Sequence, residues 1–444
     1  MGRCAVSTQK QKRPFALRAL AAFAGTLAIL FVLLLAAYAL PGERVRQHVY
    51  DSARTIQNEG LYPEYLGFKL FQMDNYTDTL MLFEAASADE LPPLQAMMTN
   101  TAYNVDNFET LADDLAWYIE KDWSTGAQRT DAPALEPFSY ARYWHGYLIW
   151  LRPLLLLMPY TGVRIVQYIV LFSLLAVVLV QLRRRCGLRA AVWFAVSQLA
   201  VSVWFVPHQV QYFTCFMIAY AGCAWVLAKP RRSDVLCLGL LVLGTATAFC
   251  DLLVTPIITL GLPLTCWLLE PQQRLRGGVP QCALAVGGSL CWGTGYALCW
   301  AGKWALAGAV TRNNVLADAL HQAEVRTTAD TWHGMELTWR NIFGFLYDTL
   351  NSHHLFWPAL AVLAVLIALF ILSIRSKTAL VRALPLALTT CMTPAWFVLL
   401  RTHSIQHGWF TWRALGLTVF AGLAFLYYAC DLRAARRRLQ KGSI

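Results

Sequence analysis

Hydrophobic residues form ten runs along the chain, separated by polar segments. The runs begin near Ala19, Gly162, Ala190, Tyr212, Val235, Val254, Cys282, Leu355, Ala383 and Phe410. Most approach the roughly 20 residues that a helix needs to cross a bilayer. A few, such as the two that flank Asp251, are shorter. The pattern predicts an all-α, polytopic integral membrane protein with about ten transmembrane helices.

Basic residues gather in alternate connections between these runs, in the N-terminal segment and in the tail. The connections contain Arg183, Arg184, Arg185, Arg189, Lys229, Arg231, Arg232, Arg274, Arg276, Arg375, Lys377 and Arg382. The positive-inside rule places these segments in the cytoplasm. An even number of spans returns both ends of the chain to that side. We therefore predict a multi-pass protein of the cell membrane with both termini cytoplasmic.

This topology divides the chain into seven parts. They are a cytoplasmic N-terminus (1–18), the first transmembrane helix (19–40), an extracytoplasmic loop subdomain (41–146), an interfacial helix with transmembrane helices (147–302), a second extracytoplasmic loop (303–354), the C-terminal transmembrane helices (355–430) and a basic cytoplasmic tail (431–444).

Composition supports the membrane class and argues against nucleic-acid binding. Charged residues make up 14% of the chain, whereas soluble domains average about 25%. The net charge is +11, yet residues 41–146 contain 17 acidic and seven basic residues. The basic excess therefore reflects topology and attraction to membrane lipids. Ten of the twelve cysteines lie in or beside the apolar runs and no CxxC pair occurs, which is typical of packing residues.

Both long loops have helical periodicity. The first loop has two stripes of residues at helical spacing: a first stripe of Val45, Val49, Ser52 and Ile56, and a second of Phe108, Leu111, Leu115 and Tyr118. The second loop has a third stripe of Val315, Ala319 and Ala323, and a fourth of Trp339, Ile342, Phe343 and Leu346. The aromatic sequence from Tyr143 to Tyr147 is of the type found at membrane interfaces. It leads into the apolar segment 148–158, which is too short to span. We predict that this segment is an interfacial helix that brings Arg152 to the outer boundary.

Two carboxylates in the first loop are candidates for catalysis. Asp74 and Asp78 are four residues apart and would share one face of a helix. A carboxylate at the outer membrane face can act as the general base that removes a proton from an attacking hydroxyl. The alternative is structural: Asn75 caps a helix through Leu80 with Asp78 as its third residue, and Asp74 only solvates the turn.

Cations and histidines gather at the predicted outer ends of helices, against the general trend. The candidate substrate-binding residues are Arg152, Lys303, Arg401, Arg413, His403 and His407, with Asp251 as a lone acid at a helix end. Guanidinium groups bind phosphate bidentately, so the set predicts a phosphate or pyrophosphate site. Charge balance against the acidic loop is the alternative. An ionisable residue at membrane depth, such as Asp251, is expected to be functional or paired.

This layout resembles the GT-C superfamily of membrane glycosyltransferases, which use polyprenyl-phosphate-linked sugar donors. The resemblance rests on the many spans, the long first outer loop with Asp74 and Asp78, and the cations Arg401 and Arg413. It implies transfer of a hexose or pentose to a glycan, lipid or protein acceptor at the outer face, and it leaves a divalent cation open as cofactor. One departure is that the family often places its catalytic acid within a few residues of the first span, whereas Asp74 lies more than 30 residues beyond it.

Two other classes remain open from the sequence. A transporter or flippase of a lipid-linked or glycan substrate would have a similar number of spans. It should, however, show ionisable residues at mid-membrane and often an internal repeat, and neither is evident in the sequence. A scaffold that binds polymers would keep the folded outer loop without needing an acid and cations that converge.

The predicted topology can be tested with reporter fusions or cysteine accessibility at Ala88 and Arg184. Ala88 should report the outside and Arg184 the cytoplasm, because every strongly basic short loop then lies inside. Finding both positions on the same side of the membrane would overturn the orientation.

Overall fold

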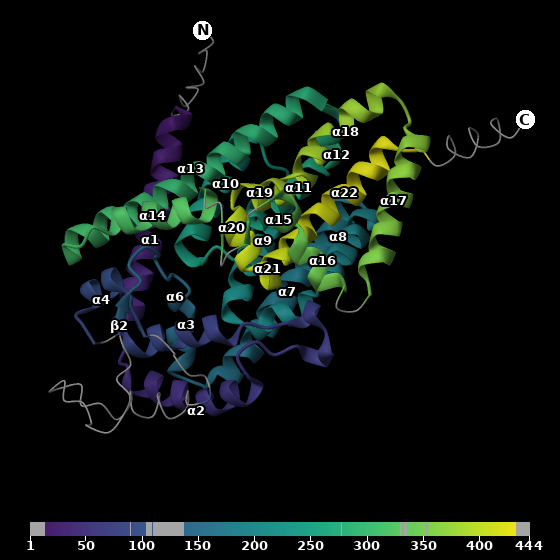
Figure 1. The fold of residues 1–444 in the computed structure, drawn as a ribbon. Helices are drawn as coiled ribbons and strands as arrows, with labels where there is room; N and C mark the ends of the chain where they lie inside the picture. Colours follow the sequence, from purple (N-terminus) through teal and green to yellow (C-terminus); the bar gives the residue numbers. More distant parts are fainter. Residues whose placement is uncertain are drawn as a thin grey trace, which may run out of the picture.

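The computed structural model describes residues 14–88, 90–103, 109, 137–276, 278–328, 331–332, 335–336, 338–351 and 354–431. This part of the chain is built almost entirely from helices (Figure 1). Its strands form two small antiparallel pairs, β1 (Thr101–Tyr103) with β2 (Pro137–Ser139) and β3 (Thr331–Trp332) with β4 (Met335–Glu336). The all-α prediction is confirmed in the described residues.

Seven helical stretches in the described residues are long and apolar enough to cross a membrane. They are α1 (Phe15–Tyr38), α7 (Tyr160–Cys186), α9 (Val210–Ala228), α10 (Ser233–Cys250), α13 (Gly278–Thr311), the stretch Lys377–Leu399 and the stretch Gly408–Ala429. Shorter apolar helices are α8 (Leu188–Ala200), α11 (Ile257–Leu268) and the segment Phe356–Ala368 of α17 (Phe356–Ser373). All ten hydrophobic runs are thus helical, and ten crossings stay a prediction because α8 and α11, with 13 and 12 residues, fall well short of about 20.

The stretch Lys377–Leu399 consists of α18 (Lys377–Thr390) and α19 (Met392–Leu399), and the stretch Gly408–Ala429 consists of α21 (Gly408–Thr411), the 3-10 turn η5 (Trp412–Ala414) and α22 (Leu415–Ala429). The remaining helices are shorter and connect or cover the long ones. They are α2 (Glu43–Glu59), α3 (Asn75–Ser87), α4 (Pro93–Thr99), α6 (Leu148–Leu155), α12 (Pro271–Arg276), α14 (Val315–Thr328), α15 (Trp339–Ile342), α16 (Gly344–Asn351), α20 (Arg401–Gln406) and the 3-10 turns η1 (Tyr65–Gly67), η2 (Lys69–Phe71) and η4 (Val203–His208).

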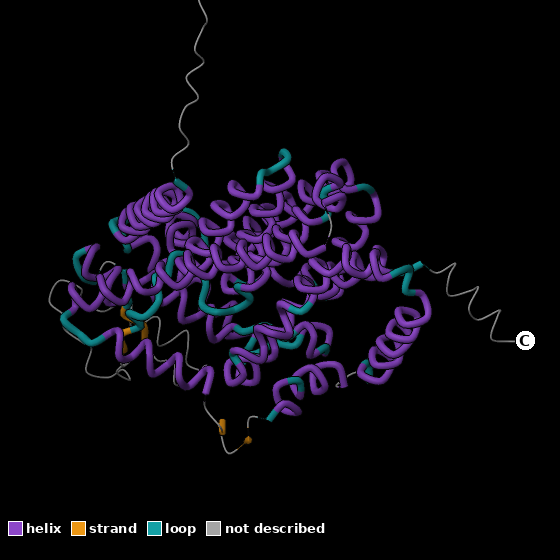
Figure 2. The backbone as a smooth tube through the Cα atoms, turned by 90° about the horizontal axis from the view of Figure 1, so that it is seen from above, coloured by secondary structure: helices purple, strands orange, loops and turns teal. Residues whose placement is uncertain are grey.

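The long helices pack side by side. α10 lies along α13, α9 packs against α7 and α11, and α18 packs against α22. α17 stands at the edge of the bundle (Figures 1 and 2), where Ile374 pairs with Cys430 at the end of α22. Figure 1 shows α2, α3 and α4 together at the end of α1 that lies away from the N-terminus. We call this end, with α14 and α20, the loop face, and the end with the basic connections the basic face.

Ion pairs join the basic connections to one another. Arg18 pairs with Asp234 at 2.9 Å, and Arg185 pairs with Glu270 at 2.8 Å. These contacts link residues that are far apart in sequence, so the structure brings the predicted cytoplasmic segments together. The orientation of that face relative to a membrane stays a prediction.

Helices of the loop face follow the predicted stripes in part. In α2, Val45, Val49, Ser52 and Ile56 are buried, as predicted. In α14, Val315 and Ala319 are buried. The fourth stripe is not one helix, because the chain breaks at Phe343 between α15 and α16. The second stripe, from Phe108 to Tyr118, lies outside the described residues.

The N-termini of α3 and α9 cap each other. The Asp78 carboxylate on α3 accepts hydrogen bonds from the backbone N–H groups of Val210 (3.1 Å) and Gln211 (3.3 Å), which begin α9. In return, Gln209 Oε1 accepts from the N–H of Asp74 (2.8 Å), and Gln209 Nε2 donates to Asn75 Oδ1 (2.9 Å). We call these six residues the α3–α9 junction. It satisfies helix-end donors that burial would otherwise leave without partners.

The aromatic sequence before α6 is buried in protein. Tyr143, Trp144, His145 and Tyr147 are each at most 4% exposed, which corrects the expectation of an interfacial aromatic cluster. Trp144 donates its indole N–H to the carbonyl of Cys299 (2.8 Å). These residues therefore fasten the loop face to α13.

Buried cations of the loop face bind backbone carbonyl groups near helix ends. Lys303 Nζ on α13 donates to the carbonyl of Met97 (2.7 Å), in the last turn of α4, and to Asn100 Oδ1 (2.6 Å). Arg152 on α6 donates to the carbonyl of Leu40 (2.7 Å), just beyond α1. A positive charge is favourable there because helix C-termini carry unpaired carbonyl groups.

Replacing Lys303 by methionine should destabilise the fold by about 3 kcal/mol, because the Met97 carbonyl and the Asn100 amide oxygen lose a hydrogen-bond donor while staying buried. Denaturation of the purified protein in detergent measures the change. Lys229→Met, at an exposed position of the basic face, serves as the control. Equal stability of the two variants would show that Lys303 does not hold α4.

Candidate functional site

A cavity of about 320 Å³ with a partly polar lining lies along α3 at the loop face. We call it the carboxylate cavity. Its lining residues come from the 3-10 region before α3, from α3 itself, from the segments around Tyr140 and Leu252, and from α20 and α21; they are Tyr62, Asp74, Tyr76, Thr77, Leu80, Met81, Glu84, Tyr140, Tyr147, Leu252, Gln406, His407 and Trp409. On α3, Tyr76, Leu80 and Glu84 recur every four residues with Thr77 and Met81 beside them, so one face of the helix forms the wall.

Asp74 lines this cavity as the N-cap of α3. Its Oδ1 accepts from the Thr77 N–H (2.9 Å) and its Oδ2 from the Thr77 hydroxyl (3.0 Å). This corrects the structural alternative above, because Asp74 and not Asn75 caps the helix. Burial raises the pKa of the Asp74 carboxyl, and the hydrogen bonds from Thr77 act against the rise. A fixed carboxylate with a raised pKa is suited to proton transfer.

Glu84 is a second carboxylate in the same cavity. Its Oε2 lies 2.6 Å from His145 Nδ1 and accepts a short hydrogen bond from the Tyr147 hydroxyl. Its Oε1 is buried and has no hydrogen-bond partner among the described residues. A buried oxygen without a partner is costly, so Glu84 Oε1 is an acceptor available to a ligand.

The backbone around His145 is shaped to make this contact. His145 adopts φ +55°, a left-handed conformation that is uncommon for residues other than glycine. The next residue, Gly146, donates its N–H to the carbonyl of Phe249 (2.9 Å), and a Cβ at Gly146 would clash with that carbonyl and with the Phe249 ring. Glycine at position 146 thus allows the chain to approach Phe249 closely directly after His145.

His407 completes the opposite wall. Its ring stacks on Phe410 with 5.2 Å between ring centres, and its Nδ1 has no partner among the described residues. Burial, together with the nearby charge of Arg326, lowers the pKa of His407 to about 4. The imidazole is therefore neutral near pH 7 and contributes a hydrogen-bonding atom rather than a charge.

Asp78 belongs to the α3–α9 junction and is not a lining residue of the carboxylate cavity. Besides the two N–H groups of α9, it accepts a short hydrogen bond from the Tyr160 hydroxyl. Burial raises the pKa of its carboxyl to about 7. The geometry favours a structural role for Asp78 over the catalytic role predicted for it.

The predicted cations do not gather at this cavity. Arg413 donates to the carbonyl groups of Trp409 (3.1 Å) and Leu70 (3.4 Å), and its guanidinium lies over the Tyr212 ring. Arg401 begins α20. Neither is a lining residue of the cavity described above, so a phosphate role for them stays a prediction, as it does for Arg152 and Lys303.

Asp251 and His403 hold the segment between α10 and α11. The Asp251 carboxylate accepts from the N–H of Val254 (3.2 Å), and burial raises its pKa to about 6. His403 Nε2 lies 2.9 Å from the carbonyl oxygen of Leu253, a residue with φ +68°. Both contacts restrain this short turn. Burial also lowers the pKa of His403, so this ring is neutral.

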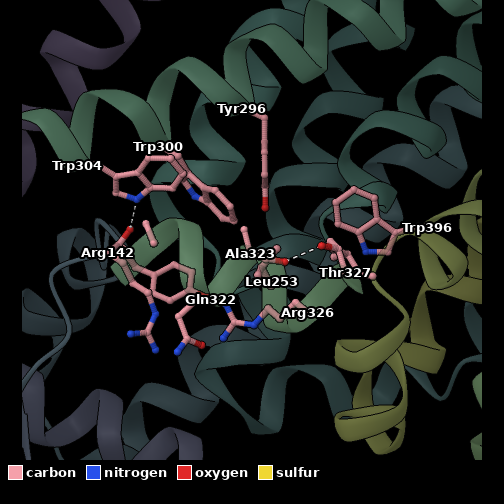
Figure 3. A pocket seen from close by; sticks show the side chains of 13 residues that line it. Arg142, Leu253, Tyr296, Trp300, Trp304, Gln322, Ala323, Arg326, Thr327 and Trp396 are labelled. Atoms are coloured by element: carbon pink, nitrogen blue, oxygen red, sulfur yellow. Dashed lines mark hydrogen bonds between the residues drawn. The ribbon is translucent and has the colours of Figure 1, made fainter. Parts of the chain in front are cut away.

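A second, more apolar cavity of about 110 Å³ lies on the other side of that turn. We call it the aromatic cavity. Its floor is a ladder on α13, in which Tyr296, Trp300 and Trp304 follow one another four residues apart. Figure 3 shows Arg142 and Arg326 at its rim; Arg326 donates to the Tyr143 hydroxyl at 2.8 Å. Leu252 lines the carboxylate cavity and Leu253 the aromatic one, so two consecutive residues separate the spaces.

Sequence reasoning missed Glu84 and Arg326. Glu84 follows the apolar residues Met81, Leu82 and Phe83, and an acid within such a run is a signal that could have been used. Arg326 ends a predicted amphipathic helix and had no distinguishing pattern.

The arrangement can hold a polar ligand of sugar size. Carboxylate oxygens at Asp74 and Glu84 can accept hydrogen bonds from hydroxyl groups, and the aromatic rings of the wall can stack on the C–H faces of a sugar ring. Asp74 can in addition take up a proton.

No protein-family model, no curated protein and no solved structure matches this chain.

Proposed function

We propose that the protein is a membrane glycosyltransferase that moves a sugar from a polyprenyl-phosphate donor to a hydroxyl of a glycan, lipid or protein acceptor. The observation that carries the proposal is the carboxylate cavity, in which two carboxylates, Asp74 and Glu84, line one space together with aromatic rings. With the predicted orientation, this cavity opens at the outer end of the spans. That layout is what the resemblance to the GT-C superfamily implies.

In the proposed reaction, the acceptor hydroxyl attacks the anomeric carbon of the donor sugar. Asp74 takes the hydroxyl proton as the new carbon–oxygen bond forms. The bond from the anomeric carbon to the phosphate oxygen breaks, and the phosphate leaves with the electron pair. Glu84 Oε1 accepts a hydrogen bond from a hydroxyl of the bound sugar or acceptor, which orients the reacting groups.

The donor phosphate needs a positive charge where negative charge develops. We assign this charge to Arg326, which lines the aromatic cavity beside Leu253, next to the residue that borders the carboxylate cavity. Arg142 lies on the same rim, where it also pairs with Asp318 at 3.3 Å. We propose that these arginines hold the phosphate and that the ladder on α13 receives the first isoprene units.

The roles of the two carboxylates can be separated by isosteric substitution. Asp74→Asn keeps a residue that caps helices well, so expression and donor binding should persist while transfer falls by at least about 100-fold. Glu84→Gln keeps an acceptor oxygen and should raise KM more than it lowers kcat. Transfer is measured as release of polyprenyl phosphate from a panel of labelled lipid-linked sugars.

Glu90→Gln is the matched control for this experiment. Glu90 also accepts a hydrogen bond from a tyrosine hydroxyl, that of Tyr103 (2.8 Å), but it does not line the carboxylate cavity. Normal turnover by Asp74→Asn would contradict its role as base. Movement of labelled lipid across liposomes without any transfer would instead support the transporter or flippase alternative.

The pH dependence of transfer follows from the raised pKa of Asp74. A general base must be deprotonated, so kcat/KM should rise with pH. The midpoint of the rise should lie above the value of about 3.9 that is usual for aspartate. A profile of the wild-type enzyme between pH 4 and 8 measures this limb. Asp74→Asn should lose it, and a limb that persists in that variant would assign the titration to another group.

A further inference from the structure

The basic face contains a cavity of about 360 Å³ that the proposed reaction does not use. It lies between α12, the start of α13, the start of α18 and the end of α22. Arg274, Arg375 and Arg382 line it, and no acidic residue belongs to its lining in the described chain. Three guanidinium groups around one cavity without a carboxylate create a site for an anion.

The N-terminus of α18 adds to this positive field. Ser376 caps the helix by accepting from the N–H of Ala379 (3.1 Å), and both residues line the cavity together with Thr378. The helix has 14 residues, so its first turn presents N–H groups and the positive end of the helix dipole to the same space.

Two polar atoms of the cavity wall are buried without partners among the described residues. They are Arg274 Nε and Gln281 Oε1. Gln281 is 2% exposed, and its amide nitrogen is already used by Gln273 (3.1 Å). Arg274 is held in place by the Tyr428 hydroxyl (2.6 Å). Both residues belong to the lining of the cavity, so its wall holds a cationic group and a neutral amide whose hydrogen-bonding capacity the described residues do not fill.

The apolar part of the lining indicates where such an anion comes from. Leu268, Pro385 and Leu386 line the cavity beside the arginines. On the adjoining surface of α18, Val381 and Leu384 are 47% and 42% exposed, as expected for side chains that face lipid. Basic pockets between membrane helices on the cytoplasmic side commonly hold lipid head groups.

We propose that this cavity binds the head group of an anionic membrane phospholipid, with the phosphate at Arg274, Arg375 and Arg382 and a head-group hydroxyl at Gln281. The site lies on the basic face, whereas the carboxylate cavity lies on the loop face. It anchors the junction of α12, α18 and α22 and does not depend on the glycosyltransferase proposal.

The test uses the full-length protein in nanodiscs of phosphatidylcholine to which phosphatidylglycerol is added, with bound lipid counted by native mass spectrometry. Wild type should retain phosphatidylglycerol selectively. The double variant Arg375→Gln/Arg382→Gln should bind it at least about tenfold more weakly. Arg184→Gln is the control, because Arg184 is an exposed arginine of the basic face that does not line the cavity.

Three results would overturn the proposal. They are equal retention of phosphatidylcholine and phosphatidylglycerol, unchanged binding by the double variant, and an equal loss in Arg184→Gln. Competition by millimolar inorganic phosphate distinguishes the source of the anion. Displacement of the lipid at that concentration would assign the site to free phosphate, and persistence of the lipid supports the head group.

Discussion

The loop face depends on hydrogen bonds to the backbone N–H groups in the first turns of two helices, α3 and α9, which are buried away from water. The first N–H groups of a helix have no partner within it, and a buried donor without a partner costs about 1–3 kcal/mol. The α3–α9 junction meets this constraint reciprocally, since Asp78 binds the N–H groups of α9 while Gln209 binds Asp74 and Asn75. Because the junction fixes the direction of α3, it also determines which side chains of that helix face the carboxylate cavity.

A second principle joins the loop face to the long helices. Buried cations there bind backbone carbonyl groups of segments distant in sequence, as in Lys303 with Met97 and Arg152 with Leu40. Arg164 binds a carboxylate as well as a backbone carbonyl group. It forms a bidentate ion pair with Glu59 and donates to the carbonyl of His208 (2.9 Å). These contacts explain why cations collect at this end of the bundle without requiring a ligand for each.

The helical class and the positions of the hydrophobic runs could be predicted from sequence because apolar length and periodicity are local properties. The buried stripe of α2 was predictable for the same reason. The partners of Lys303 and Arg413 were not, because a backbone carbonyl from a distant segment leaves no mark in the sequence. The four-residue spacing places Asp78 near Asp74 on α3 and predicts a catalytic role for both. In the structure, however, Asp78 lies in the α3–α9 junction, whereas Asp74 lines the carboxylate cavity.

Glu84, in contrast, is a cavity residue to which the sequence pattern gave no functional role. From sequence it is one acid at the end of an apolar stretch, and only the fold brings His145 and Tyr147 to one of its oxygens and leaves the other free. The strained geometry at His145 and the tight approach of Gly146 to Phe249 are tertiary requirements. Such features usually mark sites where structure serves function.

The turn between α10 and α11 has a mechanical consequence. Leu252 and Leu253 are neighbours in the chain but face different cavities, and the backbone at Leu253 is held in an unfavourable conformation by its contact with His403. This two-residue partition cannot move toward one cavity without withdrawing from the other. A shift of this turn therefore changes the shape of both cavities at once, so a donor that extends from one cavity into the other would feel the position of Leu252 at one end and of Leu253 at the other.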